Sequence, residues 1–257
     1  VARHHRRHAK KDELLQEIQA FLAAGADLEG DARLRQRFQQ VDMLGEVDRK
    51  AYEAERALLL EEVAGREQNV AEPLIHLHHQ TCQRSWSWGK TDAAVEALHT
   101  LRTRFPENDL ARRRIFENVV RLLRECPRRK NATTVTEKLR PFYAVAAAKR
   151  SERDRDHLYR VMYDAETSAG NAAQALEAAD KLCTLRPGHQ GYMLDRARAL
   201  DRVGRREDAE AAVRAVILKN PLDGKAYEAQ ALLARVAAEE EQWDEALGRA
   251  RVLLDVA

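Results

Sequence analysis

The 257-residue chain has few of the residues that build tight loops, strands and cross-links. It contains 11 Gly, 6 Pro and 3 Cys, and aromatic residues make up 5% of it. Sparse glycine and proline exclude a collagen-like chain, and three widely spaced cysteines exclude a disulfide-built scaffold. The apolar run at 144–148 is far shorter than the roughly 18 residues that a membrane-spanning helix needs. The sequence therefore predicts no membrane span.

The residues that are abundant favour helices. About a third of the chain is charged, with 44 Lys and Arg against 42 Asp and Glu, and Ala, Leu, Arg and Glu recur throughout. These residue types lose little rotamer freedom in a helix, so we expect an all-α protein. The charge is unevenly spread, because residues 12–72 hold 15 acids and 7 bases whereas residues 101–130 hold 10 bases and 4 acids. Solvated helix faces and a basic groove for an acidic partner both fit this asymmetry.

The cysteines and the N-terminal residues bear on the cellular location of the chain. Cys82, Cys126 and Cys183 lie within helical patterns, which is typical of buried, reduced thiols. Residues 1–11 are basic and lead into an acidic amphipathic segment without the apolar core of a secretory signal. We therefore expect a flexible N-terminus and a cytoplasmic location.

Apolar spacing predicts three helices in the acidic segment 12–72. Stripes of helical period run from Leu14 to Phe21 and from Leu34 to Val41, and a longer one extends from Val47 to about residue 69. Gly45 is expected to end the second of these helices. Pro73 marks the boundary of this N-terminal segment, because its ring fixes φ and it lacks a donor.

Beyond Pro73 the sequence repeats. A glycine is followed by alanine 5 residues later and by proline 17 residues later in three units, and two of these units are 34 residues apart. A period of this length is typical of helical repeat arrays. Glycine suits the tight turn of a helix pair, a small alanine allows close helix approach, and proline closes the unit. The three sets are Gly89, Ala94 and Pro106; Gly170, Ala175 and Pro187; and Gly204, Ala209 and Pro221.

These motifs, with Trp88-Gly89-Lys90 and Trp243-Asp244-Glu245-Ala246, resemble the tetratricopeptide repeat (TPR) family over about residues 74–257. The resemblance implies a right-handed α-solenoid of antiparallel helix pairs. Its expected units are about 75–106, a divergent 108–150, 156–187, 190–221 and a truncated 227–257. Positions 9 and 12 residues after each glycine, such as Leu98 and Leu101, are expected to be core.

The resemblance also implies a function, which is non-catalytic binding of a partner protein's peptide or helix on the concave face of first helices. The two arginines Arg198 and Arg202 share a helix face at i and i+4 and could hold a carboxylate, and a plain solvated face is the alternative. Trp86 is a candidate aromatic anchor, with core packing as its alternative. The partner-binding candidates are His79, Gln83, Trp86, Arg160, Asp164, Arg198 and Arg202.

Other chemistry receives weaker support from the sequence. Arg121, Arg124 and Arg128 have the spacing of a helical anion stripe, but few aromatics accompany them for nucleic-acid stacking. His78 and Cys82 are i and i+4, yet two ligands do not make a metal site. Nucleophile elbow, Walker and zinc-protease motifs are absent from the sequence. We therefore predict no catalytic residue, no cofactor and no metal.

The apolar C-terminal sequence at 252–257 resembles no polar capping helix, which repeat arrays usually carry. We therefore expect another molecule to cover this end, either a partner protein or a second copy of the chain in a homo-oligomer. The alternative interpretation is that the chain is the targeting or oligomerisation module of a larger bacterial enzyme, such as a glycosyl- or sulfotransferase. The partner and the pathway are not specified by the sequence.

Overall fold

A computed structural model describes residues 13, 16–18, 20, 30–65, 70–221, 223–239 and 241–254, with the backbone alone at 30, 31, 243 and 251–254. These residues form helices and turns and contain no strand. The chain divides into two compact units, residues 1–118 (unit 1) and 119–257 (unit 2). The first predicted N-terminal helix, from Leu14 to Phe21, and Gly25 lie largely outside the described residues.

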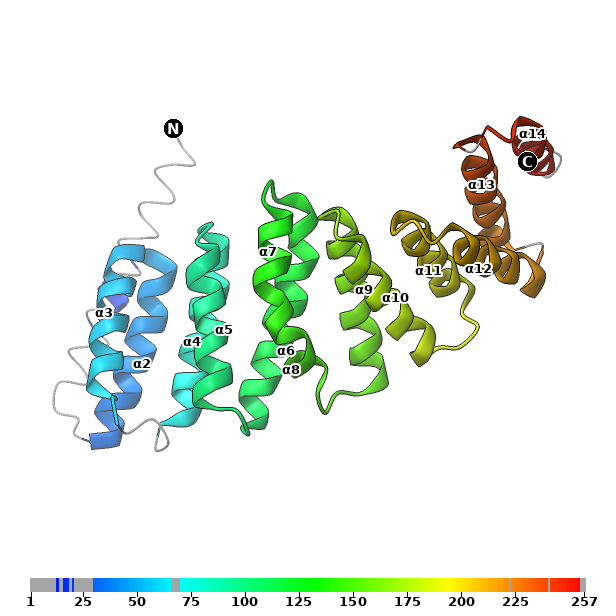
Figure 1. Cartoon of the computed structure of the whole chain (residues 1–257). Helices are drawn as coiled ribbons and strands as arrows, with labels where there is room; N and C mark the ends of the chain where they lie inside the picture. The colour runs from blue at the N-terminus through cyan, green and yellow to red at the C-terminus, as the bar shows by residue number, and fades with distance from the viewer. Residues whose placement is uncertain are drawn as a thin grey trace, which may run out of the picture. The chain divides into compact units, whose positions relative to one another are not determined.

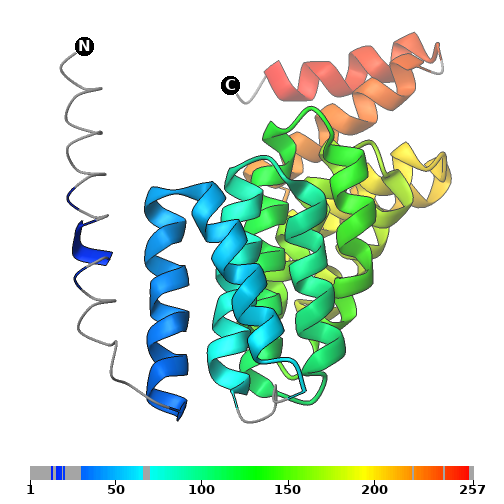
Figure 2. The same cartoon turned by 90° about the vertical axis from the view of Figure 1, so that its left-hand side faces the viewer.

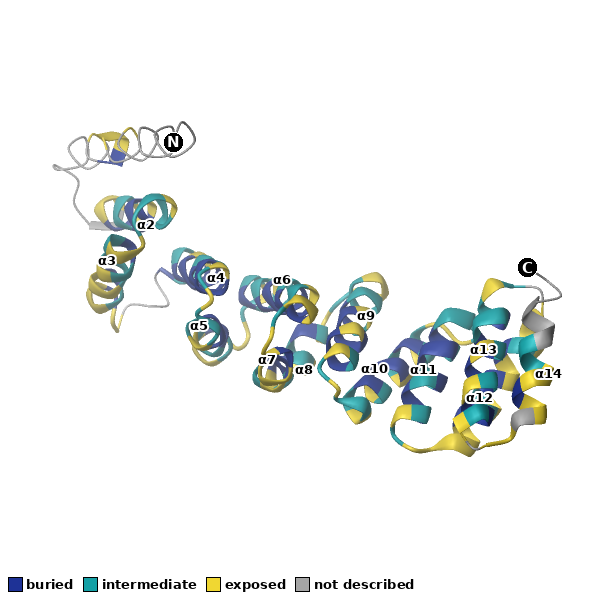
Figure 3. Cartoon of the chain, turned by 90° about the horizontal axis from the view of Figure 1, so that it is seen from above, coloured by how far each residue is buried: buried dark blue, intermediate teal, exposed yellow. Residues whose placement is uncertain are grey.

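The described residues of unit 1 form two helix pairs and most of a further helix (Figure 1). Seen from above, α2 and α4 lie on one side of the unit and α3 and α5 on the other (Figure 3). The helices are α2 (Gly30–Val47), α3 (Arg49–Glu62), α4 (Ala71–Ser87), α5 (Thr91–Arg104) and α6 (Asp109–Glu125), whose last residues belong to unit 2.

The α2–α3 turn lies after Val47, so the prediction that Gly45 ends the helix is wrong. Asp48 makes the turn instead, because its carboxylate accepts hydrogen bonds from the backbone N–H groups of Lys50 and Ala51 and caps α3. The two helices lie side by side (Figure 2). Since α2 also packs on α4, this pair lies in the same compact unit as α4 and α5, although the sequence placed it in a separate segment.

Gly45 has a different role, because it makes room for the side chain of Arg84 from α4. A Cβ at this position would lie 2.3 Å from the Arg84 guanidinium carbon. Arg84 has a side chain that is 9% exposed, and it forms ion pairs with Asp42 at 2.9 Å and Glu46 at 3.0 Å. Its guanidinium also lies 5.1 Å from the ring centre of Tyr52. Charge and cation–π contacts thus join α4 to the α2–α3 pair.

Unit 2 continues the helix pairs after an irregular start. The 3₁₀ turns η1 and η2 and the short α8 interrupt the predicted divergent unit, because Pro127 and Pro141 cannot continue an α-helical hydrogen-bond pattern. Its elements after α6 are η1 (Cys126–Arg128), α7 (Ala132–Leu139), η2 (Arg140–Phe142), α8 (Tyr143–Ala147), α9 (Glu152–Ser168), α10 (Ala172–Leu185), α11 (Gln190–Arg202), α12 (Arg206–Lys219), α13 (Gly224–Glu239) and α14 (Trp243–Leu254).

A buried carboxylate organises this irregular region. Glu166 of α9 is fully buried, and the Arg140 guanidinium donates to both of its oxygens at 3.1 and 3.0 Å. The Tyr143 hydroxyl donates at 3.0 Å, and the Asn171 amide donates at 2.7 Å. Because a buried charge needs such partners, these contacts fix η2 and α8 against α9 without a regular helix pair.

The predicted glycine turns are confirmed. Gly89, Gly170 and Gly204 have φ values of +76°, +77° and +77°, a left-handed conformation that disfavours other residues. In each turn the N–H of the next residue bonds to a carbonyl five residues back, which closes the preceding helix in the same way. The corresponding turn before α14 has Glu241 at φ +61°, so an L-residue takes the glycine conformation there.

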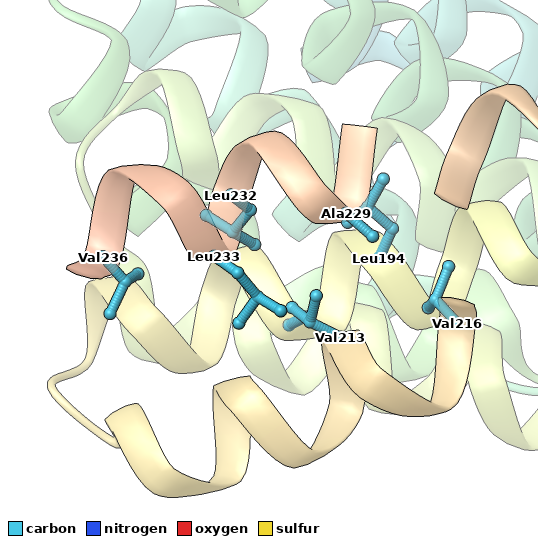
Figure 4. Packing of buried hydrophobic residues seen from close by; sticks show 8 residues of the cluster. Leu194, Val213, Val216, Ala229, Leu232, Leu233 and Val236 are labelled. Carbon is cyan, nitrogen blue, oxygen red and sulfur yellow. The ribbon is translucent and has the colours of Figure 1, made fainter. Parts of the chain in front are cut away.

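The predicted core positions are confirmed as well. Ala94, Ala175 and Ala209 are buried, as are the paired positions in α5, α10 and α12, which include Leu98 and Leu101. In unit 2, side chains from α11, α12 and α13 form one apolar cluster, shown in Figure 4. The labelled members are Leu194, Val213, Val216, Ala229, Leu232, Leu233 and Val236. The chain is therefore an all-α solenoid-type array of TPR-like helix pairs.

Candidate functional site

Unit 1 has a groove of about 820 Å³ on its first-helix face, between α2, the start of α4 and the start of α6. Its floor is apolar, because Leu34 and Phe38 of α2 and Leu77 of α4 are buried there. A volume of this size lies within the range of roughly 300–1,000 Å³ that is usual for ligand sites. The full lining is Leu34, Arg35, Phe38, Gln39, Asp42, Val70, Ala71, Glu72, Pro73, His76, Leu77, Leu110 and Arg114.

The rim of this groove is polar and of mixed charge. Arg35, Gln39, Glu72 and His76 are exposed along it. Arg114 is half-buried, and its guanidinium donates to Glu117 at 2.7 Å. An apolar floor with a polar rim is the usual anatomy of a protein-binding surface, since the floor supplies burial and the rim supplies orientation.

The sequence does not reveal this groove, because its lining residues come from three helices that are far apart in the chain. The stripe from Leu34 to Val41 predicts a helix, but nothing local shows that Phe38 and Leu110 line the same groove. The nearest sequence signal was Pro73, which lies in the first turn of α4 and lines the groove.

Unit 2 has a row of charged side chains on its first-helix face. The guanidinium of Arg160 on α9 lies 3.6 Å from the carboxylate of Asp195 on α11. Arg198 lies 3.6 Å from the same carboxylate and donates to Glu228 on α13 at 2.7 Å. Lys225 also donates to Glu228. We call these five residues the charge ladder, because successive links join three first helices.

Burial and charge act in opposite directions on the acids of this face. Burial raises the pKa of Asp195, and the positive charges of Arg160 and Arg198 partly offset the rise. Burial likewise raises the pKa of Asp164, with Arg160 opposing it. In contrast, hydrogen bonds from Lys225 and then Arg198 lower the pKa of Glu228. The ladder therefore holds one desolvated acid and one well-solvated, strongly paired acid.

The structure brings together the predicted residues that lie in unit 2. Arg160 and Arg198 flank Asp195, so their guanidinium groups already have acidic partners. Asp164 and Arg202 are exposed on the same two helices, and neither side chain forms an ion pair with another described residue. Of the predicted partner-binding residues in unit 2, Asp164 and Arg202 are thus the two without an ion-pair partner in the described part.

The predicted residues in unit 1 lie mostly in the core. Trp86 is fully buried and therefore cannot act as an exposed anchor, which corrects the prediction. His79 is 6% exposed, and its Nε2 lies 3.0 Å from the Gln83 amide nitrogen. The physical reason is that α4 packs against α2 on one side and α5 on another, so little of its circumference reaches solvent.

The predicted anion stripe is interrupted. Arg121 pairs with Glu125 at 3.3 Å, and the guanidinium of Arg124 lies 2.7 Å from the His157 ring nitrogen. Arg128 lies in η1, beyond the end of α6, so it does not continue the helix face that its spacing predicted. Pro127 causes this change, because it ends the α-helical hydrogen-bond pattern before Arg128.

No three His, Cys, Asp or Glu side chains among the described residues are grouped as ligands of a metal ion would be. None of the helices in the described part combines the length and apolar character that crossing a bilayer requires.

No protein-family model matches the chain, and no curated protein matches it. Among solved structures it is similar to the crystal structure of MamA, with 14% identity and a TM-score of 0.44 over 68% of this chain and 93% of that one. It is also similar to TTC0263, a thermophilic TPR protein in Thermus thermophilus, with 18% identity and a TM-score of 0.35 over 71% of this chain and 91% of that one. The assignment of TPR-like helix pairs rests on the chain's own turns and core positions.

Proposed function

We propose that the chain is a non-catalytic scaffold that binds a helix or extended peptide of a partner protein on its first-helix faces. The observation that carries the proposal is the unit 1 groove, which combines about 820 Å³ of space, an apolar floor and a polar rim. A partner helix that places apolar side chains in this groove would bury their surface, which water otherwise contacts, against the apolar floor.

In unit 2 the proposal assigns partner contacts to Asp164 and Arg202. Arg160 and Arg198 already bind acids of neighbouring helices, so an incoming carboxylate would have to compete with Asp195 and Glu228. Arg202 faces no such competition among the described residues, and a guanidinium that binds a carboxylate in two-point fashion gives direction as well as energy. Asp164 supplies the opposite charge on α9, which favours a partner segment with both signs.

Site-specific photocrosslinking tests the proposal. A photoreactive residue is placed at His76 in the groove, at Arg202 on the unit 2 face, or at Leu218 as the control. Leu218 lies on the second helix α12 and is 81% exposed, so it offers equal access on a face that the proposal does not use. The three proteins are expressed in the native host and crosslinked before lysis.

The expected result is one protein crosslinked reproducibly from His76 or Arg202 and not from Leu218. Mapping the crosslinked peptide by mass spectrometry should place it in a helical or extended segment of that partner. Crosslinks from Leu218 alone, or equal crosslinks from all three positions, would contradict binding on the first-helix faces. If reversing the charge at Arg202 leaves the affinity of the chain for the crosslinked partner unchanged, Arg202 does not take part in the interface.

A further inference from the structure

Arg114 of α6 lines the unit 1 groove and is partly shielded from solvent. Its side chain is 27% exposed, whereas Arg35, the other arginine of the lining, is exposed on the rim. An ion pair that is partly buried is weakened less by water and salt than an exposed one. Of the two arginines, Arg114 therefore contributes more to the recognition of a charged partner.

The guanidinium of Arg114 is only partly used within the chain. Its Nη1 donates to a carboxylate oxygen of Glu117 at 2.7 Å, and this is its one hydrogen bond to a described residue. The Nε is shielded from solvent and has no hydrogen-bond partner among the described residues. Such donors are rare in folded proteins, because their desolvation is not compensated. The edge formed by Nε and Nη2, which suits a carboxylate in two-point contact, thus lacks an acceptor within the described part of the chain.

Glu117 keeps another partner when the guanidinium of Arg114 turns. The Nε of Arg113 donates to the other carboxylate oxygen of Glu117 at 3.0 Å. Arg113 is 67% exposed and does not line the groove. A change of rotamer that turns the Nε of Arg114 toward the groove therefore leaves Glu117 paired. The three side chains together have one positive charge in excess.

The two acids of the groove lining do not neutralise Arg114. The carboxylate of Asp42 on α2 lies 2.9 Å from the guanidinium of Arg84. Glu72 lies in the first turn of α4, where the positive end of the helix dipole favours an acid. Neither acid forms an ion pair with Arg114. The α6 side of the groove therefore presents a positive charge next to the apolar floor.

We propose that the partner helix of the unit 1 groove carries an acidic side chain beside its apolar anchors, and that the Nε–Nη2 edge of Arg114 binds this carboxylate. The proposal rests on the scaffold function and specifies one contact of the partner. A two-point contact with a guanidinium fixes the direction of the carboxylate as well as its charge. Side chains three or four residues apart share a helix face, so we expect the acid at that distance from an apolar anchor.

A library of helical peptides tests the proposal on the full chain. The peptides have about 18 residues, or five helical turns, with apolar residues at helical spacing and all other positions varied. Both ends are joined to a carrier protein, so no terminal carboxylate takes part. Binders that crosslink to a photoreactive residue at His76 occupy the groove, because His76 belongs to its lining. Among them we expect Asp or Glu to be enriched at one fixed position next to an apolar anchor.

A double-mutant cycle locates the contact. The best binder is synthesised with blocked ends, and its affinity is measured by fluorescence anisotropy before and after its acid is replaced by the matching amide. This replacement should weaken binding to the wild type by about tenfold or more, as expected for loss of a charge-assisted hydrogen bond, and should have little effect on binding to Arg114→Gln. Arg113→Gln is the matched control, because Arg113 pairs with the same Glu117 outside the groove lining. In this control the full effect of the acid should remain.

The outcomes separate this contact from binding in the groove. If binders crosslink from His76 without a preferred acid, or if their acid has the same effect on the wild type and Arg114→Gln, the Arg114 contact is refuted and binding in the groove stands. If no binder crosslinks from His76, binding in the groove fails and the contact fails with it. Arg114→Lys replaces Arg114→Gln if circular dichroism shows that the latter does not fold, since lysine keeps the charge but lacks the two-point edge. The acid should then have a smaller effect than in the wild type.

Discussion

Replacing Gly45 by alanine should destabilise unit 1, although alanine is the better helix former. Gly45 lies inside α2, where glycine-to-alanine exchange alone would stabilise the helix by about 1 kcal/mol. The added Cβ would however lie 2.3 Å from both Cζ and Nε of Arg84 and 2.6 Å from Nη1. The guanidinium must therefore move away from its position beside Asp42, Glu46 and Tyr52.

The size of the effect follows from what this movement breaks. Hydrogen bonds to charged groups contribute about 1.5–3 kcal/mol each, and a cation–π contact adds about 0.5–2 kcal/mol. The carboxylates of Asp42 and Glu46 are 44% and 72% exposed, so water replaces much of the lost interaction. A loss of about 2–4 kcal/mol against the gain in helix propensity gives a net destabilisation of about 1–3 kcal/mol.

A double-mutant cycle in urea tests the reasoning. Unfolding is followed by circular dichroism together with fluorescence, since Trp86 and Trp88 both lie in unit 1. In an Arg84→Leu background the conflicting atoms are absent, so Gly45→Ala should there stabilise unit 1 by about 1 kcal/mol. Stabilisation of the wild-type background by Gly45→Ala would refute the proposed packing of Arg84 against Gly45.

Three further predictions concern unit 2. Gly170→Ala should lower the free energy of unfolding, measured in urea, by about 1–2 kcal/mol. Gly170 has a φ of +77° and an added Cβ would meet no atom within 4 Å, so the loss comes from the left-handed backbone alone. Burial, and after it the charge of Glu166, raises the pKa of Tyr143 in the folded chain. The contribution of the Tyr143 hydroxyl to stability is therefore complete below its unfolded pKa of about 10 and declines above that pH. The Tyr143→Phe variant should lose less stability than the wild type between about pH 9 and 11, as measured by urea unfolding. Burial raises the pKa of both Cys126 and Cys183, that of Cys126 to about 11, but Cys126 is fully buried and Cys183 is partly exposed. Iodoacetamide at about pH 8 should therefore label Cys126 far more slowly than Cys183 in the native chain and equally fast in urea, as measured by peptide mass spectrometry.

The turns and core of the repeats could be predicted from the sequence because they depend on local chemistry. A left-handed turn favours glycine and a close helix approach favours a small side chain, so the spacing of Gly170 and Ala175 predicts the turn and the helix packing. The α2–α3 pair lacks this spacing and turns at Asp48 instead. Its membership of unit 1 therefore depends on packing against α4, which no local pattern reveals.

The candidate sites depended on tertiary packing and were harder to predict. Helical periodicity placed Trp86 on a face of α4, but it could not show that neighbouring helices cover that face. The spacing of Arg198 indicated its helix, but nothing in the sequence indicated that Asp195 and Glu228 pair with it.

The glycine turns of unit 2 have the same conformation, but the charge ladder gives each helix pair different charged residues on its first helix. Removal of the α11–α12 pair would bring α13 next to α9 with every glycine-type turn still in register. Asp195 lies nine residues before the turn residue Gly204, and Leu232 lies nine residues before the corresponding turn residue Glu241. In the shortened array Arg160 would therefore face Leu232 in place of Asp195. The ion pairs thus specify which helix pair can follow which. A shortened or rearranged array would keep its turns but would lose these ion pairs.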